Sequence, residues 1–277
     1  MDIELLRTFI EVNRTGHFGR AADNLFLTQS AVSARIKMLE EALGVIVFER
    51  KRNDIRLTSS GNRFLKHAKS IVDTWQLARQ DVSLQENFVS TLAIGSLIDL
   101  WELELLNWLS QLRMSHPEIA FYSTAYPAEI ITSQLLNNTL DVAVVFEHYF
   151  SPEIENRFVK RIELVMASSS PVNIEQAFDE NYIMVNWGTA YTQNHAKLFE
   201  QATVTSMYMS HGSLALQFIL DHMGTAYLPR QWVEKYETEK RLFPVTDAPV
   251  IEREIYASWR RDNDKLPVIS KFLESAA

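Results

Sequence analysis

The 277-residue sequence contains no cysteine and only 8 glycines. The absence of cysteine excludes disulfide bonds, thiolate metal sites, thiol nucleophiles and thiol-based redox sensing. The sequence also lacks any apolar run near the ~18 residues that a membrane span needs. Its first residues, "MDIELLRTF", include acids where a signal peptide carries positive charge. We therefore expect a soluble, cytoplasmic protein that does not associate with a membrane.

The residue patterns of common enzyme sites are missing as well. The glycines show neither GxGxxG nor P-loop spacing, and no two histidines are four residues apart with a glutamate between them. The run Ser168-Ser169-Ser170-Pro171 lacks the glycines that flank the nucleophilic serine of many hydrolases. We predict no catalytic residues, no metal site and no cofactor, so the protein is not expected to be an enzyme.

Positive charge is scarce overall and unevenly distributed. The formal net charge is −8, from 27 basic and 35 acidic residues. Residues 1–90 contain 13 basic and 11 acidic residues, whereas residues 91–277 contain 14 and 24. A mildly basic first part joined to an acidic second part indicates two domains with different roles.

The first 58 residues predict three helices and a hairpin. Apolar spacing predicts a helix over residues 2–13, and "FGRAADNL" predicts a short second helix. A third helix is predicted over residues 29–43, with Thr28 as its N-cap and Gly44 as its stop. Beyond it, "VIVFERKRNDIRLT" predicts two short strands around a turn. Three helices followed by such a hairpin are typical of a winged helix-turn-helix.

The third helix has one apolar face and one polar face. Val32, Ile36 and Leu39 form a stripe that we expect to be buried. The opposite face presents short or amide side chains, which suit a helix that reads base edges in the major groove of DNA. The predicted DNA contacts of this helix are Thr28, Gln29, Ser30, Ser33, Ala34, Arg35 and Lys37.

The hairpin after this helix is basic. Its phosphate contacts, which add salt-dependent affinity rather than sequence preference, are expected from Arg50, Lys51, Arg52 and Arg56. Taken singly, the polar helix face and the charged hairpin could each be plain solvated surface. Their order along the chain favours double-stranded DNA as the partner.

Residues 59–88 predict a long helix with an apolar seam. The seam residues alternate in steps of four and three, as in a coiled coil, and they are Phe64, Ala68, Ile71, Trp75, Ala78 and Val82. Such a helix needs a partner, which is either the second domain of its own chain or the same helix of a second copy. We favour a dimer, because paired reading helices fit half-sites about one DNA turn (~34 Å) apart.

The segment from Phe9 to Gly61 closely resembles the winged helix-turn-helix of LysR-type transcriptional regulators. The shared elements include Gly16-x-Phe18, Ala21-Ala22, Thr28-Gln29-Ser30-Ala31-Val32-Ser33, Leu43-Gly44 and Leu57-Thr58-x-x-Gly61. Many relatives have arginine directly after the last serine of this motif, where this chain has Ala34 followed by Arg35. The sequence therefore leaves open which phosphate or base Arg35 contacts.

This resemblance implies an oligomer that binds DNA. Members of the family form a homodimer, often within a homotetramer, and an interrupted palindromic operator is the expected target. Within the family, "RTGHFGRAADNLFLTQSAVS" and "RNDIRLT" look most like a regulator of the flagellar master operon. That similarity implies repression of flagellar genes.

Residues 89–277 alternate between predicted strands and helices. Examples are the strand-like "STLAIGSL", "DVAVVF" and "REIYASW" and a helix expected over residues 100–114. The alternation indicates βαβ units with a parallel sheet, arranged in two lobes. Lobe I is expected at about 89–147 and 263–277 and lobe II at about 148–262, with the connections at 148–152 and 259–265. The predicted fold class is α+β multidomain, with domains 1–58, 59–88 and 89–277.

The stretches "LAIGS", "LLNNTLDVAVVF" and "MGTAYLP" occur in the order found in LysR-type effector domains, which are similar to periplasmic binding proteins. In such two-lobed α/β folds a ligand lies between the lobes, at the carboxyl ends of strands and near helix N-termini. The predicted effector-binding residues are Ser96, Leu97, Ile98, Asp99, Tyr126, Pro127, Trp187, Thr189 and Met207.

The first two of these loops differ from those of many relatives. Relatives often have serine or threonine there, where this chain has Leu97, Ile98 and Asp99 in the first loop and Tyr126 and Pro127 in the second. We therefore expect a neutral or apolar effector, or no effector at all, rather than a carboxylate. For Asp99, the ordinary expectation is that it caps the helix that it begins.

The leading hypothesis is a sequence-specific transcriptional regulator of the LysR type. The alternative is a small-molecule binding or sensor protein whose first domain mainly dimerises. Salt-dependent DNA binding distinguishes the two hypotheses.

Overall fold

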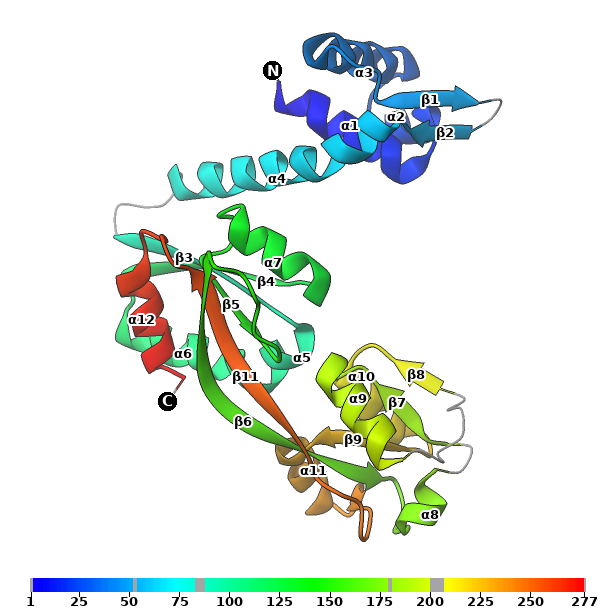
Figure 1. Cartoon of the computed structure of the whole chain (residues 1–277), viewed down its shortest axis with the longest axis vertical. Helices are drawn as coiled ribbons and strands as arrows, with labels where there is room; N and C mark the ends of the chain where they lie inside the picture. The colour runs from blue at the N-terminus through cyan, green and yellow to red at the C-terminus, as the bar shows by residue number, and fades with distance from the viewer. Residues whose placement is uncertain (1, 52–53, 83–87, 179–180, 200–206, 277) are drawn as a thin grey trace. The chain divides into compact units, whose positions relative to one another are not determined.

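The computed structural model of the chain describes residues 2–51, 54–82, 88–178, 181–199 and 207–276 (Figure 1). The chain divides into two compact units, Met1–Glu86 (unit 1) and Asn87–Ala277 (unit 2). Each unit has a hydrophobic core of its own. Across the described ranges, no helix is long and apolar enough to cross a lipid bilayer.

Unit 1 has the three helices and the hairpin that the sequence predicts, followed by a long helix. Its elements are α1 (Ile3–Thr15), α2 (Phe18–Leu25), α3 (Gln29–Leu43), β1 (Phe48–Lys51), β2 (Asp54–Leu57) and α4 (Ser59–Val82). Local signals set both ends of α3. The Thr28 hydroxyl accepts the Ala31 N–H at 3.2 Å, and Gly44 ends the helix with a φ of +70°.

The core of unit 1 lies where α1, α3, the hairpin and α4 meet. The ring centroid of Phe9 lies 5.3 Å from that of Phe48 and 5.4 Å from that of Phe64. The apolar stripe of α3 is buried as expected, and Val32 and Leu39 are fully inaccessible to solvent. Helix α3 therefore has its apolar side fixed on the unit and its polar side left free for a partner.

Unit 2 alternates strands and helices as predicted. The elements of its first part are β3 (Ser90–Ser96), α5 (Ile98–Leu100), η1 (Trp101–Leu105), α6 (Leu106–Ser115), β4 (Ile119–Ala125), α7 (Ala128–Leu136) and β5 (Val142–Val145). The second part comprises β6 (Ile154–Ser168), α8 (Ile174–Ala177), β7 (Ile183–Val185), α9 (Thr189–Leu198), β8 (Met207–Met209), α10 (Gly212–Asp221), β9 (Thr225–Pro229), α11 (Arg230–Glu237), β10 (Phe243–Pro244), β11 (Ile251–Arg260) and α12 (Leu266–Glu274). The helix expected over 100–114 begins at Ile98 and contains a π-helical turn, η1.

The main sheet of unit 2 is mixed, whereas we expected a parallel one. Its strand order is β10-β6-β11-β5-β3-β4, with β9 paired to β6. Strand β3 is parallel to both β4 and β5, but β11 is antiparallel to β5 and to β6. The antiparallel part arises because the chain leaves lobe I along β6, forms lobe II, and returns along β11 beside β6.

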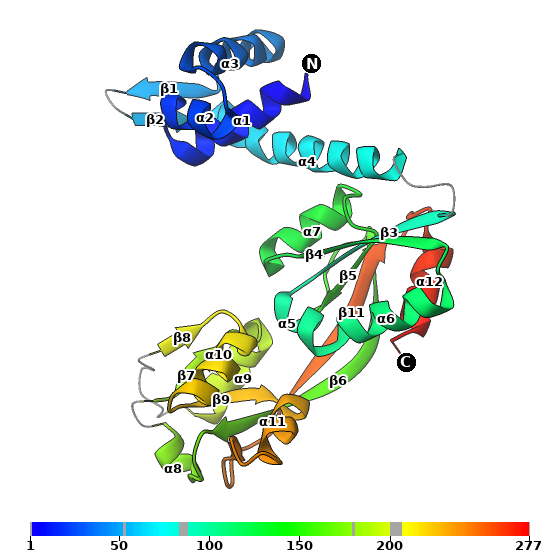
Figure 2. The same cartoon turned by 180° about the vertical axis from the view of Figure 1, so that it is seen from behind.

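Helices cover both faces of the sheet in lobe I (Figure 2). Ala143 and Val145 of β5 pack in one cluster with Ile131 of α7. The alternate residues Val142 and Val144 belong to the main core, to which α6 and α12 contribute. Because side chains alternate along a strand, α7 lies on one face of β5, and α6 and α12 on the other.

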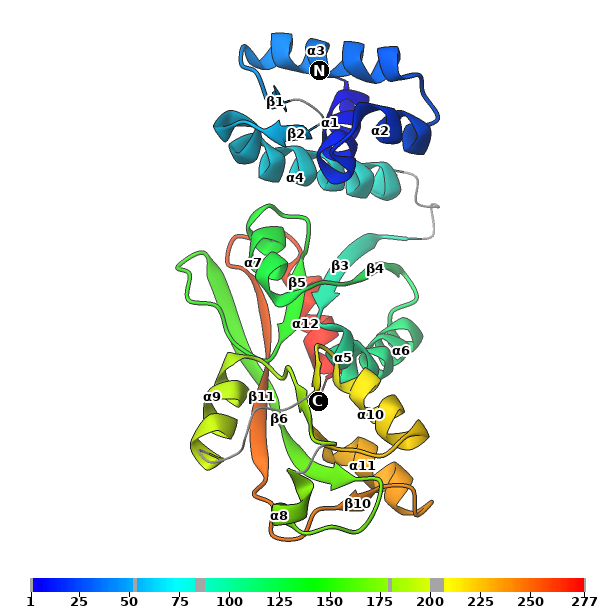
Figure 3. The same cartoon turned by 90° about the vertical axis from the view of Figure 1, so that its right-hand side faces the viewer.

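The two lobes are connected by long strands and not by the loops that we expected. Strand β6 has 15 residues and β11 has ten, and both run from lobe I into lobe II (Figure 3). Residues 256–258 pair with β5 of lobe I, while residues 164–168 pair with β9 of lobe II. The crossing thus lies within the strands, away from 148–152 and 259–265. An apolar run predicts a strand but does not reveal that one strand serves two lobes.

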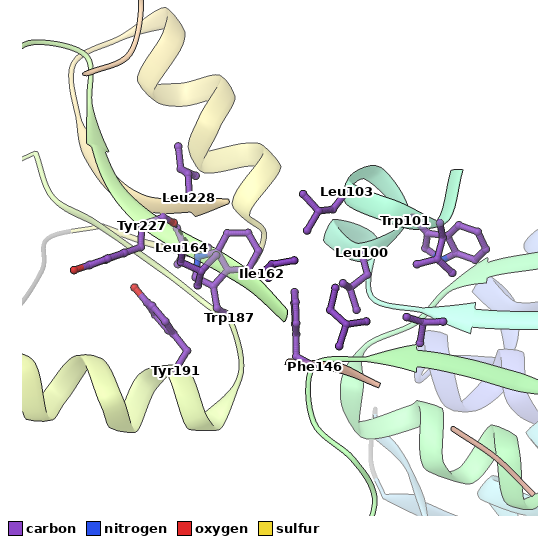
Figure 4. Packing of buried hydrophobic residues seen from close by; sticks show 14 of the residues in the cluster. Leu100, Trp101, Leu103, Phe146, Ile162, Leu164, Trp187, Tyr191, Tyr227 and Leu228 are labelled. Atoms are coloured by element: carbon purple, nitrogen blue, oxygen red, sulfur yellow. Dashed lines mark hydrogen bonds between the residues drawn. The ribbon is translucent and has the colours of Figure 1, made fainter. Parts of the chain in front are cut away.

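The hydrophobic core continues from one lobe to the other. Phe146, at the end of β5, lies between the apolar side chains of the two lobes (Figure 4). Its ring meets that of Trp187 of lobe II edge-on, with the centroids 6.0 Å apart, and Leu100 of lobe I belongs to the same cluster. The joint between the lobes is therefore packed with side chains as well as bridged by strands.

Candidate nucleic-acid interface and ligand cleft

The polar face of α3 is exposed at most of the predicted DNA contacts. The side chains of Thr28, Gln29, Ser30, Ala34 and Lys37 are exposed, and that of Ser33 is half-buried. The hydroxyl groups of Thr28 and Ser30 lie 2.9 Å apart and share a hydrogen bond, which holds the first turn of α3 in one geometry. This face is open to solvent in the described part of unit 1, so it can reach base edges.

Arg35 points in another direction. Its Nη1 donates to the Thr8 hydroxyl at 3.3 Å and lies 3.6 Å from the Glu4 carboxylate, so its guanidinium contacts α1. Lys37 is different, because its side chain is 78% exposed and its ion pair with Glu41, at 3.8 Å, is loose. Of the two cations predicted for the groove, the geometry favours Lys37.

The basic hairpin is only partly described. Arg56 lies on β2 opposite Glu49, and its side chain is exposed. Arg50 and Lys51 belong to β1, but their side chains are outside the described part, and Arg52 lies outside the described residues altogether. Their role in phosphate binding stays a prediction.

Glu40 fixes this hairpin to the end of α3. Its Oε1 accepts the backbone N–H of Val47 at 2.9 Å and that of Phe48 at 3.4 Å. Glu40 lies near the C-terminal end of α3, and no local sequence pattern indicates these bonds. The hairpin is therefore held at a fixed distance from the polar face of α3.

The predicted seam of α4 is divided between two roles. Phe64 and Ala68 pack into the core of unit 1. Ile71 and Trp75 are 42% and 47% exposed, and Val82 is 85% exposed. Together with α1, the exposed part forms a groove of about 560 Å³, lined by Asp2, Ile3, Leu6, Ser70, Ile71, Thr74, Trp75 and Ala78. The first two seam residues are part of the core of unit 1, because the start of α4 packs against the hairpin.

A cleft of about 500 Å³ lies between the two lobes of unit 2. Its walls come from the loops after β3 and β4, from Phe146, and from the starts of α9 and α10 in lobe II. The thirteen lining residues are Leu97, Ile98, Asp99, Ala125, Tyr126, Pro127, Ala128, Glu129, Phe146, Asn186, Gly188, Ser210 and His211. Five of the nine residues predicted for the effector site are among them.

The other four predicted residues do not line this cleft. Ser96 is fully buried and donates to the Val144 carbonyl at 2.7 Å, and Trp187 is fully buried with its indole N–H on the Tyr227 carbonyl at 2.9 Å. Thr189 and Met207 are likewise absent from the lining. Ser96 and Trp187 instead donate to backbone carbonyl groups in the core.

Asp99 spans the joint between the lobes. It does not cap its own helix α5, whose N-cap Leu97 has no side-chain bond. Instead its Oδ1 accepts the Ser213 N–H of α10 at 3.1 Å, and its Oδ2 lies 3.8 Å from His211 Nδ1. Burial raises the pKa of Asp99, against the lowering effect of the backbone N–H groups of Ser213 and Gly212.

Glu147 makes a second contact of the same kind. Its Oε1 accepts the Ala190 N–H at the start of α9 at 2.9 Å and lies 3.2 Å from Arg253 Nη2. Gly188 has a φ of +93°, and a Cβ there would lie 2.9 Å from both partners of this ion pair. Burial lowers the pKa of Arg253, and the Glu147 carboxylate acts against that shift. No sequence pattern indicates Glu147 or His211, because each contacts a segment that is distant in the chain.

Comparison with known proteins identifies the family. Residues 3–62 match the model described as "Bacterial regulatory helix-turn-helix protein, lysR family", and residues 85–277 match the model described as "LysR substrate binding domain". The chain belongs to the LysR family of bacterial regulators. It is a DNA-binding transcriptional regulator, as the reading face of α3 led us to expect.

Two sequence relatives of this LysR-type regulator carry the same name. HTH-type transcriptional regulator HdfR of Escherichia coli is 36% identical over 277 residues, which cover 99% of this chain and 97% of the relative. HdfR of Escherichia fergusonii has the same identity and coverage. The likeness to this regulator within the family, expected from the first segments of the chain, is confirmed.

Solved structures of full-length LysR regulators have the same fold. CbnR, a LysR family transcriptional regulator, superposes with a TM-score of 0.74 at 17% identity, covering 100% of this chain and 98% of that one. Full-length CbnR complexed with its target DNA gives a TM-score of 0.73 at 18% identity, covering 100% and 99%. The expected combination of a winged helix-turn-helix, a linker helix and a two-lobed α/β domain is confirmed.

Proposed function

We propose that this LysR-type regulator represses flagellar genes by binding an interrupted palindromic operator in the bacterial cytoplasm. The observation that carries the proposal is the exposed polar face of α3 on a chain that is 36% identical to HdfR along 99% of its length. Gln29, Ser30, Ser33, Ala34 and Lys37 make the groove contacts in this scheme. The hairpin residues Arg50, Lys51, Arg52 and Arg56 bind phosphates.

Arg35 has a positioning role in this proposal. Its contacts with Glu4 and Thr8 hold α3 at one angle to α1. The reading face is then presented in a fixed orientation, and the side chain itself need not enter the groove.

The exposed half of α4 supports a homodimer or homotetramer. Ile71, Trp75, Ala78 and Val82 continue the seam beyond the unit's own core and remain exposed to solvent. A second α4 that covers this seam would pair two reading helices for the two halves of a palindrome.

The cleft of unit 2 is the proposed effector site. It opens between lobes that are joined by two strands, so a bound molecule can alter the angle between them. A neutral or apolar effector fits the predominantly apolar lining better than a carboxylate does. The protein's role is regulatory and involves no catalysis.

The test is to map the sites that the purified protein selects from fragmented genomic DNA at near-physiological salt. We expect a recurrent interrupted palindrome upstream of a few genes, flagellar genes among them. Gln29→Ala combined with Ser33→Ala should weaken binding to that palindrome by about 10- to 100-fold and relax its sequence preference. Diffuse binding at every salt concentration would instead support the sensor protein whose first domain only dimerises.

A double variant and a matched control test whether the hairpin binds phosphates. Arg50→Ala with Arg52→Ala should weaken all DNA binding and reduce the salt slope by about one per lost contact. Arg157→Ala with Lys197→Ala removes the same charge from exposed positions in unit 2 and should leave DNA binding unchanged. Equal losses in both pairs would show a general charge effect and contradict a role for the hairpin.

A further inference from the structure

The chain fills two helix N-termini at the ligand cleft with its own carboxylates. Asp99 accepts a backbone N–H of α10, and Glu147 accepts one of α9. Both acids belong to lobe I, and both helices belong to lobe II, with ten residues each. The N-terminus of a helix attracts anions through its free N–H groups and its dipole. In this cleft those two sites are already occupied by the protein.

A carboxylate ligand would therefore meet negative charge where such folds usually offer a binding site. The cleft is lined by two carboxylates, those of Asp99 and Glu129, and by no lysine or arginine in the part of the chain that the structure describes. The nearby Arg253 does not compensate, since its guanidinium is buried beneath Gly188 and paired with Glu147. His211 Nδ1 lies 3.8 Å from the Asp99 carboxylate.

The rest of the lining is apolar and aromatic. Leu97 and Ile98 line one side, and the rings of Tyr126 and Phe146 border the same space. Aromatic rings attract cations as well as apolar groups. A volume of about 500 Å³ is within the range of sites that enclose one small organic molecule.

We propose that the cleft binds a small organic cation, a protonated amine on an apolar body. The ammonium group is balanced by the carboxylates of Asp99 and Glu129, and the body packs against Tyr126 and Phe146. This inference rests on the proposed role of the cleft as the effector site. It replaces the neutral ligand by a cationic one and keeps the apolar body.

The test uses the full-length protein and matched probes in isothermal titration calorimetry. Each probe set carries an amine, an alcohol or a carboxylate on one body, and the three bodies are 2-phenylethyl, hexyl and 2-(indol-3-yl)ethyl. We expect the amine of at least one set to bind about tenfold or more tightly than its alcohol, and its carboxylate to bind least. The proposal is overturned when no amine exceeds its alcohol, or when any carboxylate binds most tightly in its set.

Two variants connect the preference to the cleft. Glu129→Gln removes a lining charge from an exposed position, so it should reduce amine affinity about tenfold without altering the affinity for the alcohol. Asp99→Asn should also reduce the affinity for the amine. If Asp99→Asn does not fold, Glu129→Gln alone tests the assignment. Glu175→Gln on α8 is the matched control, since it removes an exposed acid outside the cleft lining. Equal losses in Glu129→Gln and Glu175→Gln would refute the assignment.

DNA binding by the same preparation separates this inference from the proposed function. A protein that selects an operator but shows no amine preference overturns only the ligand class. A protein that prefers amines through Glu129 but selects no operator overturns the regulator proposal and leaves the ligand class standing.

Discussion

At the scale of the residue, His195 shows how burial alone makes stability depend on pH. It is 7% exposed, its Nε2 lies 2.6 Å from the Tyr182 hydroxyl, and aromatic rings surround it. Burial lowers the pKa of His195, so the unfolded chain takes up a proton at a higher pH than the folded one. The folded state therefore loses stability as the pH falls below about 6.5, the ordinary histidine value.

His195→Gln should reveal this loss. The variant is expected to be less stable than the parent at pH 7.5, because Tyr182 loses its aromatic neighbour, but the deficit should shrink at pH 5.5. Urea denaturation followed by tryptophan fluorescence measures it, since five of the six tryptophans lie in unit 2. His222→Gln removes an exposed histidine and should show no such change. A deficit that is equal at both pH values would mean that His195 is not held neutral by the fold.

At the scale of the element, we expect different residues of α4 to determine the stability of unit 1 and the association of the chains. Ile71→Glu with Trp75→Glu places charges on the exposed seam, so we expect dissociation to monomers while unit 1 stays folded. Phe64→Ala removes the ring that packs on Phe9 and should cost unit 1 about 2–4 kcal/mol instead. Sedimentation velocity measures association, and circular dichroism measures stability. An oligomer that persists in the double variant would exclude this seam as its interface.

The elements also show what a sequence can predict. The ends of α3 follow from a hydroxyl and a glycine that act within four residues, and both appear where expected. The seam of α4 is different, because a heptad pattern gives the apolar face but not its partner, and Phe64 turned out to pack on its own unit. Asp99 is different again. It caps a helix more than a hundred residues further on, and no local pattern indicates such a contact.

At the scale of the whole molecule, the two units should unfold separately while the two lobes unfold together. Units 1 and 2 have separate cores, whereas β6 and β11 and the cluster around Phe146 belong to both lobes. Differential scanning calorimetry of the full chain should therefore show two transitions, with one for the whole of unit 2. A third transition would mean that the lobes are independent and that the shared strands do not couple them.

Glu147→Ala shows which of the two calorimetric transitions belongs to unit 2. It leaves the Arg253 guanidinium, 6% exposed, without its counter-charge and α9 without its carboxylate. We expect unit 2 to lose about 1–3 kcal/mol, less than for a fully buried pair because Glu147 is itself 43% exposed. Its transition should fall by about 2–4 °C for each kcal/mol, and that of unit 1 should not move. Glu252→Ala, which removes an exposed partner of Arg161, should shift neither. Because the lost contact joins the lobes, a shift of the single unit 2 transition would show that their joint sets the stability of both.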